Sequence, residues 1–405
     1  MSGKKKKVIK KTILVAGITL WILVSPLLHA EGNGVSPYVY ARVANDDNLF
    51  RLSDDAEVLA VIGTVDRDDT VTQIGAGLDI DAPFSRQRLR ANLSVYKAGY
   101  SRFDSLDHVG ADVSSVVNWE VGNLFAGDVG FKFTRQLSRF YELQAIAKDI
   151  RTRKIFFLNG GYRFHPSWRV VGDFSILDLT QTERPQLDRS ESSQAVELQL
   201  STSANTKLGT RIRHTKGNFE RLQIINGNEI NNDFTEMEYS VVLYWEGSKK
   251  SRLEGRLGLT QRDHAQASER NFNGTTGRLS YAWLITAKTR IDSAIWRGTT
   301  TREELTIFVV GNGVSIEPKW FATRKISVAA NIEYETRDFE GISEAVALVD
   351  GTRQDTATSL GVSVKYEPLD NVALSLGYDN ERRNSNIDRA DFRSKLLFVR
   401  AQVSF

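Results

Sequence analysis

The chain has 405 residues, with 53 Lys and Arg against 50 Asp and Glu, and 41% of its residues are hydrophobic. It contains no Cys, which excludes both a disulfide framework and a thiolate zinc site. Its seven Pro are scattered, and no Pro-rich or Ser-rich linker divides it. We therefore expect one continuous architecture rather than several domains.

The first 30 residues combine six Lys, the last of them Lys11, with an apolar run over residues 12–28 and a small residue, Ala30. This pattern predicts a signal peptide over residues 1–30 that is cleaved on export. The alternative is an uncleaved inner-membrane anchor, because about 17 apolar residues lie near the lower limit for a spanning helix. Removal of residues 1–30 leaves 47 basic residues against 50 acidic ones, so the charge balance does not support nucleic-acid binding.

Residues 31–405 begin with an alternating run, "SPYVYARVA" at residues 36–44, which predicts a first strand. The segment over residues 45–71 follows, irregular in pattern and rich in Asp. Its side-chain oxygens do not have the spacing of a twelve-residue calcium loop with its central Gly. We expect an acidic loop there, either solvated or folded inward to constrict a pore.

From about residue 72 the sequence repeats one unit, in which two alternating runs flank a short turn and a longer polar loop follows. Clear examples are "RLRANLSVYKA" at residues 88–98 and "KISVAANIEYE" at residues 325–335. Their period of two predicts strands with one apolar and one polar face. No further run of about 18 apolar residues indicates a spanning helix.

The runs number about 18, with 16 as the alternative count. Short and long connections alternate, as they do in outer-membrane barrels, where periplasmic turns are short and outer loops long. The fold class is therefore all-β, and residues 31–405 are predicted to form a single transmembrane up-and-down antiparallel β-barrel. An even number of strands places both ends of the barrel in the periplasm, as expected for a barrel in the bacterial outer membrane.

The closing run, "LLFVRAQVSF" at residues 396–405, supports this prediction. Its odd positions are apolar, and its last residue, Phe405, resembles the C-terminal signature by which bacterial barrels are recognised for assembly. Tryptophans give a second indication, because most of them lie near proposed short turns, as a periplasmic aromatic girdle requires. The expected girdle consists of Trp119, Trp168, Trp245, Trp283 and Trp320.

If the apolar residues face lipid, the alternate positions face the lumen. An Arg on the lipid face costs about 2–4 kcal/mol at the membrane midplane, so the many charges belong on a hydrated face. The candidates for a polymer or ion path are Arg88, Arg90, Tyr96, Lys132, Arg169, Arg211, Arg213, Glu238, Tyr244, Arg252, Arg256, Arg278, Arg290, Trp296 and Arg400.

Two interpretations of these residues remain open at this point. The charges could pair across strands and hold the wall together. Alternatively, the basic run of Arg211, Arg213, Arg252 and Arg256 could attract an acidic solute. The rings of Tyr96, Tyr244 and Trp296 could stack on sugars, or they could fill space.

Catalysis finds no support in the sequence. The four His after the signal segment form no H-E-x-x-H motif, and no G-x-S-x-G motif occurs. We therefore expect a protein that is not an enzyme, and we expect neither a cofactor nor a metal.

Three stretches resemble one known family: "YARVANDDNLFRL", "GYSRFDSLDHVGADVSSVVNWEVGNLFAGDVGF" and "GGYRFHPSWRVVGDFS". They are similar to the EpsL family of exopolysaccharide biosynthesis operon proteins, within the class of β-barrel porins. The residues that carry the resemblance are Asp46, Asp47, Asn48 and Phe50; Tyr100, Asp107 and His108; Trp119; and His165, Pro166 and Trp168.

The resemblance implies an outer-membrane component of exopolysaccharide secretion. The expected function is a passive conduit for an exopolysaccharide that leaves the periplasm. The alternatives are a general diffusion porin and a non-conducting barrel that anchors polymer or partner proteins. Expected partners are the polysaccharide, outer-membrane lipid, the barrel assembly machinery, and periplasmic or inner-membrane proteins of polymer synthesis and chain-length control.

Overall fold

The computed structural model describes residues 34–140, 146–202, 205–225, 228–266, 268–301, 308–340, 353–387 and 390–405. The predicted signal peptide at residues 1–30 lies outside these residues. Within them, no helix is long and apolar enough to cross a membrane.

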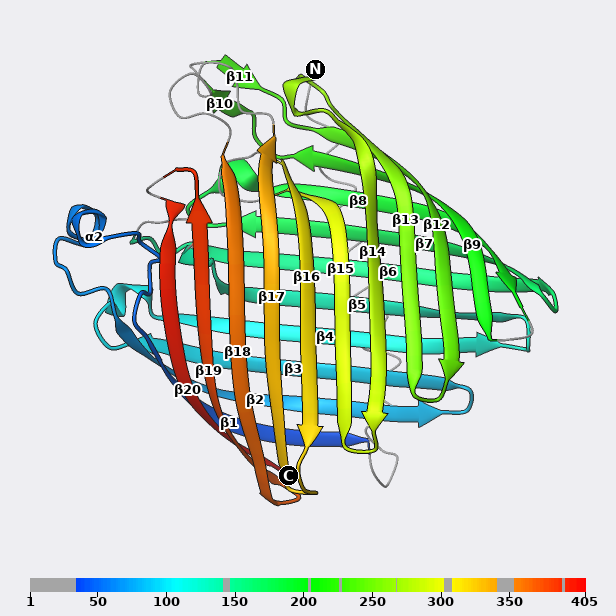
Figure 1. The fold of residues 1–405 in the computed structure, drawn as a ribbon, viewed down its shortest axis with the longest axis horizontal. Coiled ribbons are helices and arrows are strands. Elements are labelled where there is room, and N and C mark those ends of the chain that lie inside the picture. Colours follow the sequence, from blue (N-terminus) through cyan, green and yellow to red (C-terminus); the bar gives the residue numbers. More distant parts are fainter. Residues whose placement is uncertain are drawn as a thin grey trace, which may run out of the picture.

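Eighteen antiparallel strands form one closed sheet (Figure 1). Each strand pairs with its neighbours in the chain, and β1 pairs with both β2 and β20, which closes the ring. The prediction of an all-β, 18-stranded up-and-down barrel is confirmed. The barrel strands are β1 (Val35–Asp46), β2 (Asp69–Phe84), β3 (Gln87–Tyr100), β4 (His108–Val121), β5 (Phe125–Leu137), β6 (Ile150–His165), β7 (Trp168–Gln181), β8 (Arg189–Ser201), β9 (Thr206–Phe219), β12 (Phe234–Ser248), β13 (Ser251–His264), β14 (Phe272–Thr286), β15 (Thr289–Thr301), β16 (Phe308–Phe321), β17 (Ile326–Glu340), β18 (Gln354–Leu369), β19 (Val372–Ser385) and β20 (Phe392–Ser404).

Connections at the two ends of the barrel differ in length. At one end, where β1 begins and β20 ends, the strands are joined by two to four residues. At the other end the connections are longer, and one contains the small hairpin of β10 (Gln223–Ile225) and β11 (Asn228–Ile230). Because periplasmic turns are short in outer-membrane barrels, we call the first the periplasmic end and the second the outer end.

The two faces of the wall alternate along every strand. On β20, Leu397 and Val399 are each 53% exposed although no polar atom lies in their side chains. Arg400, the residue after Val399, lies on the opposite face, beside inward Tyr40 of β1. A closed barrel with an apolar exterior satisfies its backbone internally and meets lipid outside, so the protein is an outer-membrane β-barrel.

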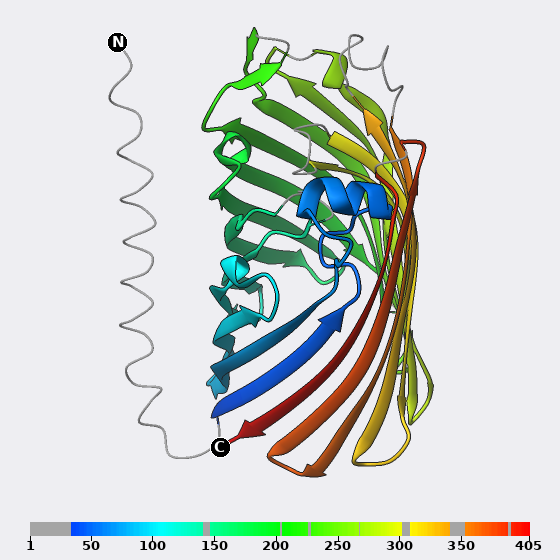
Figure 2. The ribbon, with the colours of Figure 1, turned by 90° about the vertical axis from the view of Figure 1, so that its left-hand side faces the viewer.

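Residues 47–68 connect β1 to β2 at the outer end and contain α2 (Asp55–Ile62). Asp54 caps this helix, and Gly63 ends it with a φ of 83°, a conformation that favours glycine. Figure 2 shows α2 at the outer end, beside β20 and β1. The acidic composition of residues 45–71 does not predict this helix.

A small apolar core holds the α2 segment in place. Phe50 is fully buried, and its ring packs edge-on against Phe103 and Phe140, with a distance of 4.7 Å between ring centroids in each case. Leu49, Leu52, Val58 and Leu106 complete this outer-end core. The segment is therefore a packed element that joins the β3–β4 and β5–β6 connections.

Three of the outer connections share one construction. Each is seven residues long, contains a single turn of 3-10 helix, and ends in an Asp or Asn that accepts the backbone N–H of the preceding strand's last residue. The turns are η2 (Asp104–Leu106), η3 (Pro185–Leu187) and η4 (Ser268–Arg270), and the capping bonds are Tyr100 to Asp107 at 2.8 Å, Gln181 to Asp188 at 2.7 Å and His264 to Asn271 at 2.8 Å. These caps pair backbone groups where the sheet ends.

Candidate functional site: the inner wall of the barrel

The inner wall consists of the residues that alternate with the exposed apolar ones. Cross-strand register places neighbouring members side by side, for example Arg211 of β9 opposite Glu197 of β8 and Arg278 of β14 opposite Trp296 of β15. By the same register, all fifteen candidates for a polymer or ion path lie on this wall: Arg88, Arg90, Tyr96, Lys132, Arg169, Arg211, Arg213, Glu238, Tyr244, Arg252, Arg256, Arg278, Arg290, Trp296 and Arg400. Whether a solute follows them remains a prediction.

The predicted basic run on β9 and β13 is neutralised by carboxylates. Arg211 lies 3.0 Å from Asp173 and 3.5 Å from Glu197. Glu238 forms ion pairs with both Arg213 at 3.6 Å and Arg256 at 3.1 Å. These contacts correspond to cross-strand pairing, the first of the two interpretations, rather than to a free cationic surface.

Other predicted cations pair in the same way or rest on neutral groups. Arg252 contacts Glu246 at 3.1 Å, Arg88 contacts Asp81 at 2.6 Å, and Arg290 contacts Asp292 at 2.7 Å. These three pairs are well exposed to solvent, and screening leaves little stabilisation in them. Arg90 donates instead to the amide oxygen of Asn118, and Arg169 to the carbonyl of Ala126.

A second group of cations lies over aromatic rings. Arg278 lies 5.3 Å from the centroid of Trp296, and Lys132 lies 5.9 Å from that of Phe157. At the seam between β1 and β20, Arg400 covers Tyr40 at 4.2 Å and Arg42 covers Phe398 at 4.7 Å. Cation–π contacts of this kind hold a cation against the wall without neutralising it.

The seam brings two of these cations together. Arg42 and Arg400 are direct cross-strand partners on the inner face. Neither forms an ion pair within the described residues, and like charges directly opposite each other destabilise a sheet. Arg42 is not among the fifteen predicted residues, although the alternation of "SPYVYARVA" already places it on the same face as Tyr40.

Aromatic rings on the inner wall lie against glycines of adjacent strands. Tyr96 covers Gly110 and Trp296 covers Gly313, and a Cβ added at either glycine would overlap the ring. Tyr40 covers Gly75 in the same manner. Because glycine leaves room for a ring to lie along the wall, these residues present a face to the lumen instead of projecting across it.

Two hollows line the wall near the periplasmic end. One, of about 1080 Å³, contains Asp79, Asp81, Arg88 and Arg90. The other, of about 520 Å³, contains Asp128, Arg169, Asp173, Arg211 and Tyr244. Both mix cations and carboxylates, as expected for a hydrated wall.

The five tryptophans of the expected girdle lie on the outer face, close to short connections. Trp168 begins β7, and Trp320 is 52% exposed at the second-last position of β16. Trp119 packs over Gly127 and Gly160 of the next two strands, whereas Trp245 and Trp283 lie near the ends of β12 and β14. This placement is the one that a periplasmic aromatic girdle requires, and the role of these tryptophans as a girdle remains a prediction. Phe405 lies at the same end and is 74% exposed; its role as an assembly signal remains a prediction.

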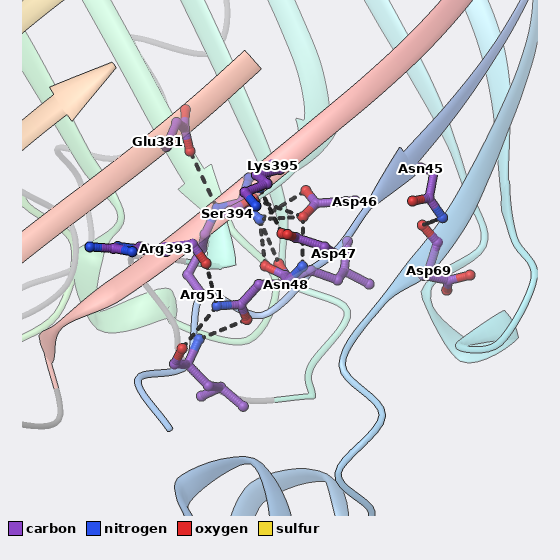
Figure 3. A network of polar contacts seen from close by, with 12 residues as sticks. Asn45, Asp46, Asp47, Asn48, Arg51, Asp69, Glu381, Arg393, Ser394 and Lys395 are labelled. Carbon is purple, nitrogen blue, oxygen red and sulfur yellow. Dashed lines mark hydrogen bonds and ion pairs between the residues drawn. The ribbon is translucent and has the colours of Figure 1, made fainter. Parts of the chain in front are cut away.

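The residues that carry the family resemblance lie at both ends of the barrel: Trp119, His165, Pro166 and Trp168 are at periplasmic turns, whereas residues 46–50 and 100–108 are at the outer end. The carboxylate of Asp46 accepts Arg51 at 2.8 Å and the hydroxyl of Ser394 at 2.8 Å (Figure 3). Asn48 donates to the carbonyl of Arg393 at 2.8 Å and accepts the N–H of Leu52 at 3.1 Å. These bonds tie the α2 segment to β20, so the motif closes the seam of the barrel.

No tight cluster of His, Asp and Glu that would hold a metal occurs among the residues the structure describes. The sequence matches no protein-family model and no curated protein, so the comparisons do not support the EpsL-type resemblance.

Solved structures of other barrels are similar to this chain. OccK2 (OpdF) of Pseudomonas aeruginosa aligns over 92% of this chain and 98% of its own, with 7% identity and a TM-score of 0.50. OccAB3 of Acinetobacter baumannii aligns over 92% and 99%, with 6% identity and a TM-score of 0.48. The outer membrane protein OpdK of Pseudomonas aeruginosa aligns over 92% and 99%, with 9% identity and a TM-score of 0.44. At these identities the likeness concerns the fold alone, and OccK2, with a TM-score of 0.50, supports the barrel fold that the strand pairing shows.

Proposed function

We propose that the protein is an outer-membrane porin, a passive channel through which small hydrophilic solutes diffuse. The observation that carries the proposal is a closed wall of 18 strands with polar residues inside and apolar residues outside. Barrels of 16–18 strands enclose an aqueous channel in porins. A porin fold therefore supports diffusion more directly than it supports export of a polymer.

The arrangement of side chains on the wall supports an open lumen. Rings lie along the wall over glycines, and most charged groups contact a neighbour on the same or an adjacent strand. Such a wall replaces part of the hydration of a passing solute without holding it tightly.

Conductance in planar bilayers tests the proposal. We expect stepwise, ohmic single-channel currents from the purified protein. A well-folded barrel that conducts no ions would overturn the proposal and favour the non-conducting structural barrel.

The two seam cations, Arg42 and Arg400, should give the channel its charge preference. We expect the double variant Arg42→Gln, Arg400→Gln to shift the reversal potential in a salt gradient toward cations. The matched control is the charge-neutral double variant Arg290→Gln, Asp292→Asn, which removes one ion pair and should leave the potential unchanged. An equal shift in both variants would contradict a special role for the seam.

Export of an exopolysaccharide remains a second candidate function, because ring faces such as those of Tyr40, Tyr96 and Trp296 suit contact with sugar rings. Deletion of the gene separates the two. If the protein is a porin, polymer still reaches the cell surface and uptake of small solutes falls. If it is an export conduit, polymer accumulates in the periplasm and uptake is unchanged.

A further inference from the structure

The lipid face of the barrel has a second feature that diffusion through the lumen does not use. Among the outward positions whose side chains the structure describes, every Lys, Arg, Asp and Glu lies near the outer end of its strand. The basic ones are Lys97, Arg135, Lys154, Lys216, Arg297, Arg382, Arg393 and Lys395, and the acidic ones are Asp178, Asp263 and Asp338. The described lipid face is thus cationic at one end only.

The height of these charges relative to the apolar belt can be followed on β20. After Lys395, the outward-facing residues of β20 are Leu397, Val399, Ala401, Val403 and Phe405. About ten residues of a tilted strand span ~25 Å, the height of the apolar band of an outer-membrane barrel. Lys395 therefore lies at the level of the headgroups of the outer leaflet.

Three of these cations gather on two adjacent strands. Arg382 of β19 is the direct cross-strand partner of Arg393 of β20, and Lys395 lies two residues further along β20. All three side chains are exposed. We call Arg382, Arg393 and Lys395 the seam triad.

Counter-ions for the triad are missing from the described part of the chain. Arg382 donates to the neutral amide of Asn384 at 2.8 Å, and within the described residues no member forms an ion pair. Two described carboxylates flank the triad, and both accept backbone groups: Asp47 accepts the N–H of Lys395 at 2.6 Å (Figure 3), and Asp391 accepts the N–H of Ser385. The other outward residues at this level, including Asn45, Asn380 and Thr356, are uncharged.

Two arginines directly opposite each other destabilise a sheet unless an anion lies between them. Arg guanidinium groups match the geometry of phosphate oxygens and bind them with paired hydrogen bonds, and a Lys adds a third positive charge. On the inner wall most cations form ion pairs with carboxylates, whereas no described carboxylate forms an ion pair with the triad. The exposed apolar belt directly below favours a partner that is embedded in the outer leaflet.

We propose that the seam triad binds the phosphate groups of a lipid headgroup in the outer leaflet. The acyl chains of this lipid lie against Leu397, Val399 and Val43, which are about half exposed. The remaining outer-end cations, among them Lys97 and Arg135, form weaker contacts of the same kind around the barrel.

Lipid retention measured by native mass spectrometry tests this proposal. The full-length barrel is reconstituted in phosphatidylcholine vesicles that contain either bis-phosphorylated lipid A or the same lipid A after enzymatic dephosphorylation, then extracted in mild detergent. We expect retention of the phosphorylated form to exceed that of the dephosphorylated form by about tenfold. Equal retention of the two forms overturns the proposal.

Variants locate the site. The triple variant Arg382→Gln, Arg393→Gln, Lys395→Gln should lose about tenfold in retention of phosphorylated lipid A. The charge-conserving variant Arg382→Lys, Arg393→Lys, Lys395→Arg should keep most of it, and the double variant Arg90→Gln, Arg278→Gln on the inner wall should keep all of it. Heat-modifiable migration on gels confirms that each barrel is folded. Unchanged retention in the triple variant, or an equal loss in the inner-wall variant, overturns the proposal.

Discussion

The two ends of the barrel are built differently. At the periplasmic end, connections of two to four residues join the strands, and tryptophans and Phe405 cover the outer face. At the outer end, buried carboxylates and amides tie neighbouring connections together, and the α2 segment adds its own apolar core. The difference shows that hairpin geometry suffices at one end, whereas longer connections need side chains to pair their backbone groups.

Among substitutions that test this difference between the ends, we expect the largest loss of stability at Asp149, just before β6. Asp149 is fully buried and accepts Arg184 at 2.8 Å and the N–H of Glu183 at 3.0 Å. Asp149→Ala leaves the buried guanidinium without its carboxylate, which should lower the free energy of unfolding by about 3–5 kcal/mol. Urea unfolding in detergent measures it.

The matched control for Asp149 is Asp81→Ala at the periplasmic end. Asp81 also contacts an Arg, Arg88, but this pair is exposed to solvent. We expect no measurable loss of stability from this variant. Equal losses at the two ends would contradict the contrast between them.

A second large effect is expected from Phe50→Ala in the outer-end core. Loss of a buried ring should cost about 3 kcal/mol or more. Because the strands do not depend on this core, the loss should appear as faster hydrogen exchange and proteolysis within residues 47–68. Exchange in β12–β17 should stay the same, and a global loss of protection would show that the core supports the whole barrel.

Removal of a loop cap should have a smaller effect. Asp188→Ala removes the acceptor of the Gln181 N–H, and Asp107→Ala removes that of Tyr100. Each change should cost about 1–2 kcal/mol, since the lost hydrogen bond has a charged acceptor. Amide exchange at residues 181 and 100 measures the effect, and the two caps should respond alike. A response at only one of them would show that the repeated construction has no common role.

Acidification should weaken the outer end selectively. Burial alone raises the pKa of Asp149, but hydrogen bonds from Glu183 and the Arg184 guanidinium outweigh it and lower the pKa below its usual value. The folded carboxyl thus holds its charge better than the unfolded one, so its contribution is present above about pH 4 and is lost as the pH falls further. Amide hydrogen exchange in the β5–β6 and β7–β8 connections, corrected for its intrinsic pH dependence, should accelerate as the pH falls through that range. In the variant Asp149→Asn this acceleration should be absent.

Period-two alternation made the strands, their number and their faces predictable, because a single solvent contacts each face. The pairing of Arg213 with Glu238 was not predictable, since register between two strands depends on turn geometry and not on composition. The caps of Asp107 and Asp188 follow a shared pattern, "DSLD" and "PQLD", that indicates a repeat without indicating its bonding partner. The same alternation also places Lys97 and Lys395 on the outer face. The charged residues predicted from the sequence, however, are only those on the lumen face.

The central claim is that alternate residues of each strand face water and lipid. The chain has no Cys, so single cysteines can be placed along β20 without other changes. In vesicles, a water-soluble maleimide should label Arg400→Cys and Gln402→Cys, whereas Val399→Cys and Ala401→Cys should stay unlabelled. Equal labelling at all four positions, or the reversed pattern, would contradict the account.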